Sequence, residues 1–394
     1  MLGSAAVRPF GIYVHFPYCS HICPYCDFAV AVAARIPHER YAAAVVKELA
    51  ARAALYAGRE AVSLYFGGGT PSLWEPACVA HVIAAGRAHF GLGRAAEITL
   101  EANPESCDAA RLRAYREVGV NRLSLGVQSF ASPSLVALGR RHSGADAARA
   151  VSEARAAGFD NLSIDLIHGD TTQTVGDARA DAARAVALSP EHISCYALTL
   201  TELAVPVPMA RAWERGDLKF PDEETQAQMG AAVREELARG GIVRYEISNF
   251  AKEGRTAVHN ALYWEGADVV QAGNGAVGLW RDPITPRGRR TINERAVGRY
   301  LEAIESGRTE LAVATVEELD AEALLRERFL TGLRRVAGID LALLEEELGL
   351  PARARHEKTI GSLVERGLAS WNGQRLALTE RGLDLHSEIA LQFF

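Results

Sequence analysis

Three of the six cysteines in this chain of 394 residues lie within eight positions, as Cys19, Cys23 and Cys26. Thiolates at this C-x3-C-x2-C spacing can hold three irons of a 4Fe-4S cluster and leave the fourth iron without a protein ligand. An open iron of this kind can bind and reduce a small molecule. The alternative is zinc, which would need a fourth ligand to complete a tetrahedron, and His15 and His21 are near enough in the sequence to supply one. The spacing is not the usual C-x2-C pair of zinc sites and therefore favours the cluster.

A run of three glycines, Gly67, Gly68 and Gly69, precedes Thr70 at the end of a β-rich segment. Because these residues have no side chains, backbone groups there can approach a ligand closely. The run lacks the Gly-Lys-Ser/Thr ending of a phosphate-binding loop, which argues against a nucleoside triphosphate. Alone, a triple glycine is a turn as often as it is a site.

Together, the cysteine loop and the glycine run resemble the radical S-adenosylmethionine superfamily, whose signature is this cysteine loop at the start of a βα barrel. The resemblance implies that the amino and carboxylate groups of S-adenosylmethionine chelate the open iron. It implies that electron transfer then cleaves the sulfonium and releases a 5′-deoxyadenosyl radical. The glycine run would cradle the methionyl amino group.

Four further segments resemble one branch of that superfamily, the oxygen-independent coproporphyrinogen III oxidase group: residues 101–104, 122–130, 138–142 and 163–167. The resemblance implies that their side chains contact S-adenosylmethionine. Carboxylates would accept hydrogen bonds from the ribose hydroxyls or the amino group, and an arginine would pair with the carboxylate. The implied contact residues are Tyr13, Gly68, Gly69, Thr70, Glu101, Gln128, Arg140 and Asp165.

A third motif, His259-Asn260-x-x-Tyr263-Trp264, resembles the haem chaperones within this group, as does the segment 245–250 just before it. An imidazole can ligate haem iron, and Tyr and Trp offer the flat apolar surface that a porphyrin needs. The resemblance implies haem contacts at His259, Asn260, Tyr263 and Trp264. Alone, His259 would read as an ordinary packed or surface histidine. The true oxidases carry a further Cys two residues past the third cluster cysteine, and this chain has Phe28 there.

Two loops depart from the group's pattern. Residues 169–174 read Gly-Asp-Thr-Thr-Gln-Thr in place of Gly-Leu-Pro-Gly-Gln-Thr, and residues 271–278 lack a Pro and a His that the group usually has. Losing a Pro frees φ and restores a backbone donor, whereas losing the His removes a polar group. Both loops should lie on the rim of the site, so the chain could be a divergent paralogue with another substrate.

The elements that must position these residues alternate between strand and helix from Gly11 to about Asn249. Repeated βα units predict a parallel sheet, whose carboxyl-terminal strand ends carry the chemistry. We therefore predict an α/β fold, a full or partial (β/α) TIM-type barrel. The predicted strands are residues 12–16, 63–66, 97–101, 122–126, 161–167, 192–198 and 243–247, and the predicted helices are 39–55, 108–118, 146–157 and 175–188.

Beyond the barrel, the Gly/Pro/Arg-rich residues 282–290 read as a connector, which divides the chain into domains 1–290 and 291–394. Helical patterns follow at 294–304, 317–333, 339–348, 352–366 and 380–391, with a β-ribbon around 368–378 that turns at Asn372-Gly373. This order predicts a winged-helix-like α+β domain. Its second helix mixes Glu357, Lys358 and Glu365, so substrate cover or partner docking is favoured over DNA binding.

Composition sets the remaining bounds. The chain has 43 Lys plus Arg against 49 Asp plus Glu, and 48% of its residues are hydrophobic, which indicates a soluble globular protein that does not bind nucleic acid through a basic surface. No stretch approaches the roughly 18 apolar residues of a membrane span. Met1 to Pro9 lacks the apolar core of a secretory signal, so the expected compartment is the cytoplasm.

Three functions are in view. The first is a haem chaperone that binds haem and delivers it to a respiratory haem protein, with the cluster and S-adenosylmethionine serving oligomerisation or transfer. Its expected partners include a reductant such as a flavodoxin or ferredoxin, with a homodimer and a membrane-associated recipient left open. The second is a radical enzyme that decarboxylates a porphyrinogen or modifies another small molecule. The third is a zinc protein with a DNA-binding tail.

Overall fold

The computed structural model describes residues 8–201 and 203–394. Residues 1–7, most of the segment searched for a secretory signal, lie outside the described residues. A single twelve-stranded sheet dominates the fold, and seven of its strands run parallel. These strands are β1 (Phe10–Phe16), β2 (Ala61–Gly68), β3 (Glu97–Ala102), β4 (Arg122–Gln128), β5 (Leu162–His168), β6 (His192–Ala197) and β9 (Asp268–Ala272).

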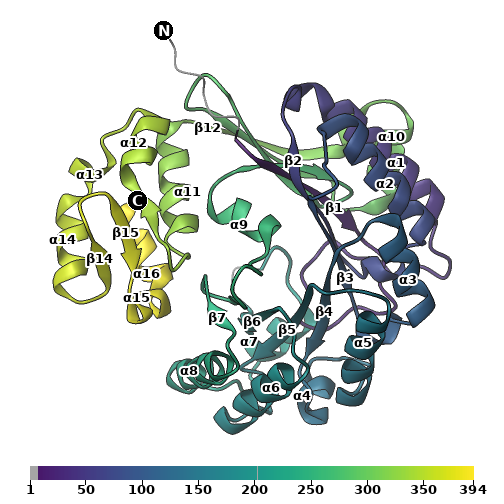
Figure 1. The fold of residues 1–394 in the computed structure, drawn as a ribbon, viewed down its shortest axis with the longest axis horizontal. Helices are drawn as coiled ribbons and strands as arrows, with labels where there is room; N and C mark the ends of the chain where they lie inside the picture. The colour runs from purple at the N-terminus through teal and green to yellow at the C-terminus, as the bar shows by residue number, and fades with distance from the viewer. Residues whose placement is uncertain (1–7, 202) are drawn as a thin grey trace.

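The sheet curves into a partial barrel with helices on its outer side (Figure 1). It stays open because β6 pairs with β8 (Asn249–Ala251) and not with β9, which pairs with β1. The predicted alternation is confirmed, and the helices begin at local signals such as the capping box of Ser143 with Asp146. The helices of this part are α1 (His38–Arg52), α2 (Pro76–Phe90), α3 (Ala109–Val118), α4 (Ser132–Ala137), α5 (Gly144–Ala156), α6 (Val175–Ala187), α7 (Pro208–Glu214), α8 (Glu223–Arg239), α9 (Val258–Trp264) and α10 (Val297–Glu305).

One predicted strand, residues 243–247, is not a parallel strand. The chain forms only β7 (Val243–Arg244), then turns and runs back antiparallel as β8. The turn is held by the buried carboxylate of Glu246, which accepts hydrogen bonds from the Ser248 amide at 2.8 Å and the Asn249 side chain at 2.6 Å. These hydrogen bonds hold residues 246–249 in a turn, so β7 ends at Arg244 and does not continue to residue 247.

The predicted connector at residues 282–290 is also different in the structure. It is mostly the turn of a hairpin between β10 (Val277–Arg281) and β11 (Gly288–Asn293), closed by the Asp282 carboxylate, which accepts from the amides of Ile284 and Thr285 at 2.8 Å. Strand β11 then pairs with β12 (Val313–Leu319), so the sheet runs past the expected boundary at residue 290. The helix predicted from residue 317 starts only after Asp320, whose carboxylate caps it.

A second, smaller unit follows the sheet, and it has the winged-helix-like order that the sequence predicts. Its three-stranded antiparallel sheet has the order β13-β15-β14 and turns at Asn372. The predicted helix 352–366 is interrupted at His356 into two helices. The elements are α11 (Ala321–Gly332), β13 (Ile339–Asp340), α12 (Leu341–Leu348), α13 (Ala352–Arg355), α14 (Glu357–Glu365), β14 (Ala369–Trp371), β15 (Arg375–Leu378), α15 (Glu380–Asp384) and α16 (His386–Ala390).

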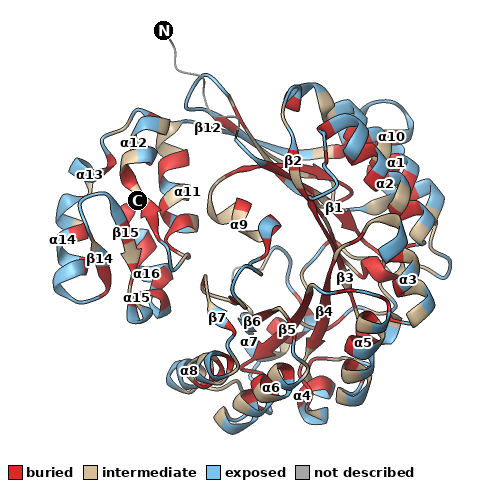
Figure 2. Cartoon of the chain, viewed as in Figure 1, coloured by how far each residue is buried: buried red, intermediate tan, exposed pale blue. Residues whose placement is uncertain are grey.

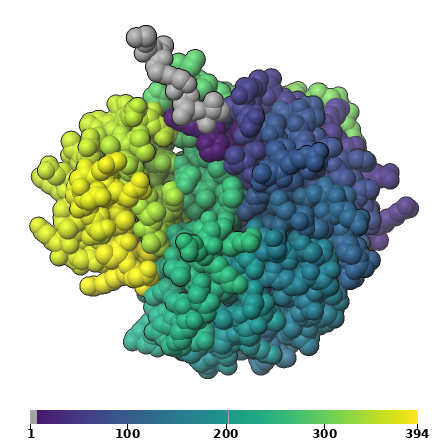
Figure 3. Space-filling view, in the orientation of Figure 1, coloured from purple at the N-terminus to yellow at the C-terminus, as the bar shows by residue number. Residues whose placement is uncertain are grey.

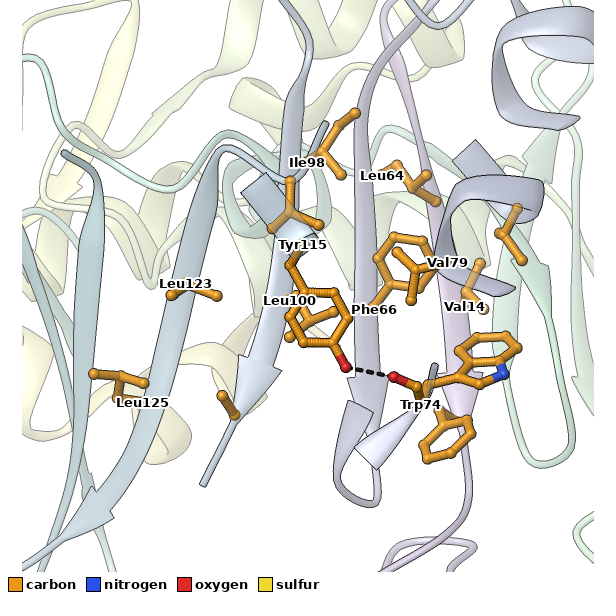
Figure 4. Packing of buried hydrophobic residues seen from close by; sticks show 14 of the residues in the cluster. Val14, Leu64, Phe66, Trp74, Val79, Ile98, Leu100, Tyr115, Leu123 and Leu125 are labelled. Carbon is orange, nitrogen blue, oxygen red and sulfur yellow. Dashed lines mark hydrogen bonds between the residues drawn. The ribbon is translucent and has the colours of Figure 1, made fainter. Parts of the chain in front are cut away.

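The core lies between the sheet and its outer helices. Side chains that alternate along β1 to β4, such as Val14, Phe66, Leu100 and Leu125, point outward and pack beneath the helices and loops that carry Trp74 and Tyr115 (Figure 4). Figure 2 shows the parallel strands of the barrel mostly buried and the helices exposed on their outer faces. The opposite, inner face of the same strands is therefore free to carry polar side chains.

The C-terminal unit packs against the open side of the barrel, where Figure 3 shows it in yellow beside the teal and green part of the chain. Helix α9 lies inside the curve of the sheet, between β2 and α11 (Figure 1). In the part of the chain that the structure describes, no helix is long and apolar enough to cross a membrane.

Candidate functional site

One cavity of about 530 Å³ opens at the carboxyl-terminal ends of the parallel strands. It gathers the three cysteines and seven of the eight residues predicted to contact S-adenosylmethionine. Tyr13 is the exception: it lies on the inner face of β1, with its hydroxyl 3.2 Å from His15 Nδ1, and does not line the cavity. The lining residues among those predicted are Cys19, Cys23, Cys26, Gly68, Gly69, Thr70, Glu101, Gln128, Arg140 and Asp165.

The cysteine loop is fixed by backbone pairing at its base. The Cys19 amide donates to the Ala31 carbonyl at 3.0 Å, the Ala31 amide donates to the Pro17 carbonyl at 2.8 Å, and the Cys26 amide donates to the Cys23 carbonyl at 3.1 Å. Burial raises the pKa of the Cys26 thiol to about 11. A cationic iron centre would offset this burial cost, because thiolates are the ligands of such clusters.

In this arrangement both candidate fourth ligands for zinc contact backbone carbonyls, although His21 Nε2 also lies 3.9 Å from Cys23 Sγ. His15 Nε2 is 3.1 Å from the Ala29 carbonyl, and His21 Nε2 is 3.0 Å from the Gly139 carbonyl. Within residues 8–201 and 203–394, no three His, Cys, Asp or Glu side chains converge on a point that could hold one metal ion. A 4Fe-4S cluster places each thiolate on a different iron, so the three thiols fit that group better than they fit zinc.

The glycine run lets the end of β2 pass against the cysteine loop. Gly68 has φ +110°, and a Cβ there would lie 2.5 Å from the His15 ring. A Cβ on Gly69 would lie 2.7 Å from the Pro17 carbonyl carbon, and the Gly69 amide donates to the Phe16 carbonyl at 2.7 Å. The run therefore joins two walls of the cavity, in addition to exposing backbone groups to a ligand.

Two carboxylates reach the cavity from neighbouring strands. Glu101 accepts from the Tyr65 hydroxyl at 2.7 Å and from the Gly68 amide at 3.2 Å, and burial raises the pKa of its carboxyl to about 7. Asp165 accepts from the Ser124 hydroxyl at 3.0 Å, and burial raises the pKa of this carboxyl as well. Both groups are therefore poised to receive a cationic or hydroxyl-bearing ligand.

A buried cation, Arg122, lies on β4, between the strands that carry these acids, and 3.9 Å from Glu97; it was not among the predicted site residues. Its side chain lines the cavity, is 1% exposed, and has an Nε atom without a hydrogen-bond partner among the described residues. Its positive charge opposes the burial effect on both Glu101 and Asp165. Strand alternation in the sequence could have identified Arg122 as a site residue, because Arg122 and Ser124 are two residues apart and share the inner face of β4.

Arg140 is held by backbone and amide oxygens at the ends of β3 and β4. Its Nη2 donates to Asn103 Oδ1 at 2.7 Å and to the Gly126 carbonyl at 2.8 Å, and its Nη1 lies 3.7 Å from Cys23 Sγ. Asn103 also donates to Thr70 Oγ1 at 3.1 Å and was missed as a site residue. Gln128 has φ +66°, a strained conformation beside a bulge in the β4–β5 pairing, which is a common feature of ligand sites.

The predicted haem motif lies mostly away from the cavity. The Glu97 carboxylate accepts from the amides of Val258 and His259, at 3.0 and 2.9 Å, and so anchors the start of α9. The His259 side chain is then 1% exposed, with Nδ1 2.9 Å from Ser63 Oγ and Nε2 3.3 Å from the Tyr263 hydroxyl. Burial, reinforced by Arg122, lowers the pKa of His259 to about 3. Haem contact at His259 stays a prediction, and it would require the hydrogen bond at the coordinating nitrogen to break.

The other three motif residues face different surroundings. Asn260 lines the cavity. Tyr263 stays inside the barrel with His259, whereas Trp264 points toward the C-terminal unit, where the Arg334 guanidinium lies 4.4 Å from its ring centroid. Arg334 also pairs with the buried Glu246 carboxylate at 3.0 Å. In this structure the motif links the barrel interior to the C-terminal unit.

The two unusual loops have their own stabilising bonds. The Asp170 carboxylate accepts from the Thr172 amide and hydroxyl, both at 2.7 Å, so a side chain stabilises this turn. In the second loop, the Asn274 side chain accepts from the Tyr41 hydroxyl at 2.8 Å and donates to the Ala29 carbonyl at 3.1 Å. That loop therefore supports the end of the cysteine loop.

Apolar side chains stand exposed at the cavity mouth, a feature that sequence reasoning did not foresee. Ile22 and Phe28 line the cavity, yet their side chains are 53% and 58% exposed. Val32, close to them in the chain, is 55% exposed. Exposed apolar groups gathered at a site indicate a surface that an apolar molecule or another protein can cover.

Comparisons with known proteins agree with this geometry. The radical SAM superfamily matches residues 13–183, and the HemN C-terminal domain matches residues 319–385. Over its full length the fold is similar to that of coproporphyrinogen III oxidase (HemN) from Escherichia coli, described as a radical SAM enzyme, with a TM-score of 0.81 and 23% sequence identity over 99% of this chain and 91% of that one. This likeness establishes the fold alone.

Closer relatives in sequence carry the name heme chaperone HemW. The protein from Mycobacterium tuberculosis is 36% identical over 95% of this chain and 92% of its own length. The protein from Bacillus subtilis is 32% identical over 96% and 97%, and that from Escherichia coli is 35% identical over 75% and 78%. With identity of this degree running nearly from end to end, and with the cysteine loop in place, the chain belongs to the HemW family of the radical SAM superfamily.

Proposed function

We propose that this protein is a haem chaperone that binds haem and passes it to a haem-requiring protein. The observation that carries the proposal is the single cavity that gathers the three cysteines with seven predicted S-adenosylmethionine residues, in a chain related over almost its whole length to proteins named heme chaperone HemW. The cofactors of this superfamily are a 4Fe-4S cluster and S-adenosylmethionine, and the residues present fit both.

In the proposed site, Cys19, Cys23 and Cys26 hold the cluster, and the exposed Ile22 and Phe28 border it. When bound, the cluster supplies an open iron and an electron to S-adenosylmethionine. The chain's own residues bind and orient that ligand, and each has a chemical match to part of it. The glycine run and the carboxylates Glu101 and Asp165 suit the ammonium and ribose hydroxyls, while Asn260 suits a polar edge and Arg140 suits the carboxylate.

The remaining partners belong to this proposal as well. A respiratory haem protein would receive the haem, a flavodoxin or ferredoxin would reduce the cluster, and the protein would act in the cytoplasm, as a homodimer and with a recipient at the membrane where one exists. A reducing compartment is consistent with six cysteines that are all free thiols. The exposed apolar groups at the cavity mouth offer a surface for one of these protein partners.

A second candidate function is radical chemistry on a small molecule, such as decarboxylation of a porphyrinogen. The observation that favours it is the complete cavity, which retains its buried acids and arginines and has an apolar mouth. Against it, Phe28 stands where the true oxidases have a further Cys.

The two functions separate in an anaerobic experiment on the reconstituted protein. Haem is titrated and followed by absorbance, and coproporphyrinogen turnover is measured with S-adenosylmethionine and a reductant. Saturable haem binding without turnover supports the chaperone, and turnover without haem binding supports the enzyme. Variants Cys19→Ala, Cys23→Ala and Cys26→Ala should lose the brown colour of the cluster. Cys78→Ala, at a buried cysteine of α2 outside the cavity, should keep it.

A further inference from the structure

A groove of about 860 Å³ lies in the C-terminal unit, between α13, α14 and the turn after β14. Among the described residues, none before Glu345 lines it, so the barrel takes no part in its walls. Figure 1 shows α13, α14 and β14 on the side of this unit that faces away from the barrel. The groove is therefore a surface that the proposed cofactor site does not use.

One face of α14 forms the floor of the groove. The lining residues of this helix follow the spacing i, i+3, i+4, i+7 and i+8, which places them on one face. Ile360, near the middle of that face, is buried, whereas Val364 is 40% exposed. The face thus has an apolar centre with an acid at each end. Its residues are Glu357, Ile360, Gly361, Val364 and Glu365.

The walls beside this face are largely apolar, and the space above its middle is open. Pro351 and Ala354 line the groove at α13, and the partly buried Trp371 lines it at the end of β14. A Cβ on Gly361 would meet no heavy atom of the described residues within 4 Å. Because the distance between two packed helices depends on the side chains at their contact, a glycine here lets a second helix approach closely.

The charged residues of the groove carry an excess of acid. Glu345 pairs with Arg353, whose Nε lies 2.7 Å from the carboxylate. Glu357 and Glu365 form no ion pair with any described residue. Three carboxylates and one guanidinium give the lining a net charge of −2. Since eight positions separate Glu357 from Glu365, the two unpaired acids stand about 12 Å apart along the helix.

These features select one kind of ligand. In a helix-turn-helix unit the second helix enters the groove of DNA and needs cations beside the phosphates, whereas the open face of α14 ends in acids. Strand β14 is only three residues long, which is too short an edge to hold an added strand. An apolar floor with helical spacing and an acid at each end instead matches a helix with an apolar face and basic borders.

We propose that the groove between α13, α14 and β14 binds an amphipathic helix of a partner protein, with apolar residues placed between basic residues about two turns apart. The apolar side chains of that helix contact Ile360, Val364 and Trp371, and its basic side chains pair with Glu357 and Glu365. Binding here does not depend on the haem-chaperone function, because the groove shares no residue with the cavity of the cysteines.

The test uses the full-length protein and a fluorescent synthetic peptide, followed by anisotropy. The peptide has about 16 residues, with Leu along one helical face and Lys at its borders. It should bind saturably, and a scrambled peptide of the same composition should bind about tenfold more weakly or worse, because it keeps the charge and loses the apolar face. Equal binding of the two peptides, or binding of a labelled DNA duplex in place of the peptide, would overturn the proposal.

A matched pair of glycine variants locates the binding. Gly361→Arg places a bulky cation in the groove and should weaken peptide binding by about tenfold or more. Gly298→Arg, on α10, is the control, because Gly298 is also an exposed helical glycine with open space at its Cβ position and the change in net charge is the same. Glycine is a poor helix former, so both variants should fold. Equal affinities in the two variants would place the peptide elsewhere.

A pair of charge variants tests the acids. Glu357→Gln with Glu365→Gln should weaken binding by about fivefold at low salt, and less at high salt. Glu117→Gln with Glu302→Gln, at exposed acids of α3 and α10, removes the same charge and should leave binding unchanged. Equal losses in the two double variants would show that the peptide responds only to net charge, which contradicts a site in the groove. Haem titration of the same variants reports separately on the chaperone function.

Discussion

Replacing Gly68 by Ala should damage both the stability of the protein and its cluster. Gly68 has φ +110°, a conformation that costs an L-residue about 1–3 kcal/mol. The new Cβ would lie 2.5 Å from His15 Cε1, so the ring must move away from the Ala29 carbonyl, which it contacts at 3.1 Å. Losing that bond costs about 1 kcal/mol more. The expected loss in the free energy of unfolding is therefore about 2–4 kcal/mol.

Gly58→Ala provides the matched control, because Gly58 also has a positive φ, +76°, but nothing lies within 4 Å of its Cβ position. It should lose only about 1 kcal/mol. Urea unfolding of the two variants without the cluster isolates the contact with His15. Because the His15–Ala29 bond supports the end of the cysteine loop, iron content after reconstitution should also fall in Gly68→Ala and not in Gly58→Ala. Equal losses of stability and equal iron content in the two variants would refute this reasoning.

Three further changes test other parts of the site. The pKa of Glu101 is raised to about 7 from an unfolded value of 4.5, so its contribution to stability is fully present below pH 4.5 and is lost as the pH rises through 7. Urea unfolding should show a loss of about 2.5 kcal/mol between pH 5 and pH 8, and Glu101→Gln should remove it. An unchanged pH dependence would contradict the assignment. Arg140→Ala should weaken S-adenosylmethionine binding by about tenfold or more in calorimetry, whereas Arg141→Ala, at its neighbour outside the cavity, should not. Arg334→Ala should lower the free energy of unfolding in urea by about 2–4 kcal/mol, because it leaves the Glu246 carboxylate buried without its cation. Arg353→Ala removes a cation from an exposed pair and should cost less than about 1 kcal/mol. Equal losses in the two variants would show that the burial of Glu246 does not determine the cost.

Much of the barrel could be predicted because each parallel strand is recognisable from a short stretch of the sequence. Four of the first six strands, β2 to β5, are short runs with glycine or polar residues at or just after their ends, and functional side chains lie at those ends. What could not be predicted depends on contacts between distant segments. Strand β9 lies beside β1 although more than 250 residues separate them in sequence, and the turn at Glu246 depends on a carboxylate that is satisfied by its neighbours and by Arg334.

In the site, too, the residue types could be predicted from the sequence, whereas the surroundings of each side chain could not. The family resemblance named the ten predicted residues that line one cavity. Strand direction explains most of them, because the carboxyl ends of β2, β3, β4 and β5 meet at one edge of the sheet, whereas Arg140 follows α4. The role of a histidine cannot be read in that way. His259 belongs to a motif, yet a carboxylate on β3 draws its helix into the barrel and two hydroxyls occupy its nitrogens.

His168 belongs to no motif, and its buried Nδ1, without a hydrogen-bond partner among the described residues, can be recognised only in three dimensions. One residue along β5 decides which cavity a side chain enters, so Ile167 borders the proposed S-adenosylmethionine site and His168 borders a second cavity beside α8. The imidazole is left without a partner because α8 presents Gly230 to it, where most residues would bring a side chain. The hydrogen bonds available to a buried imidazole are thus a property of the elements that surround it, and the pattern of the sequence does not record them.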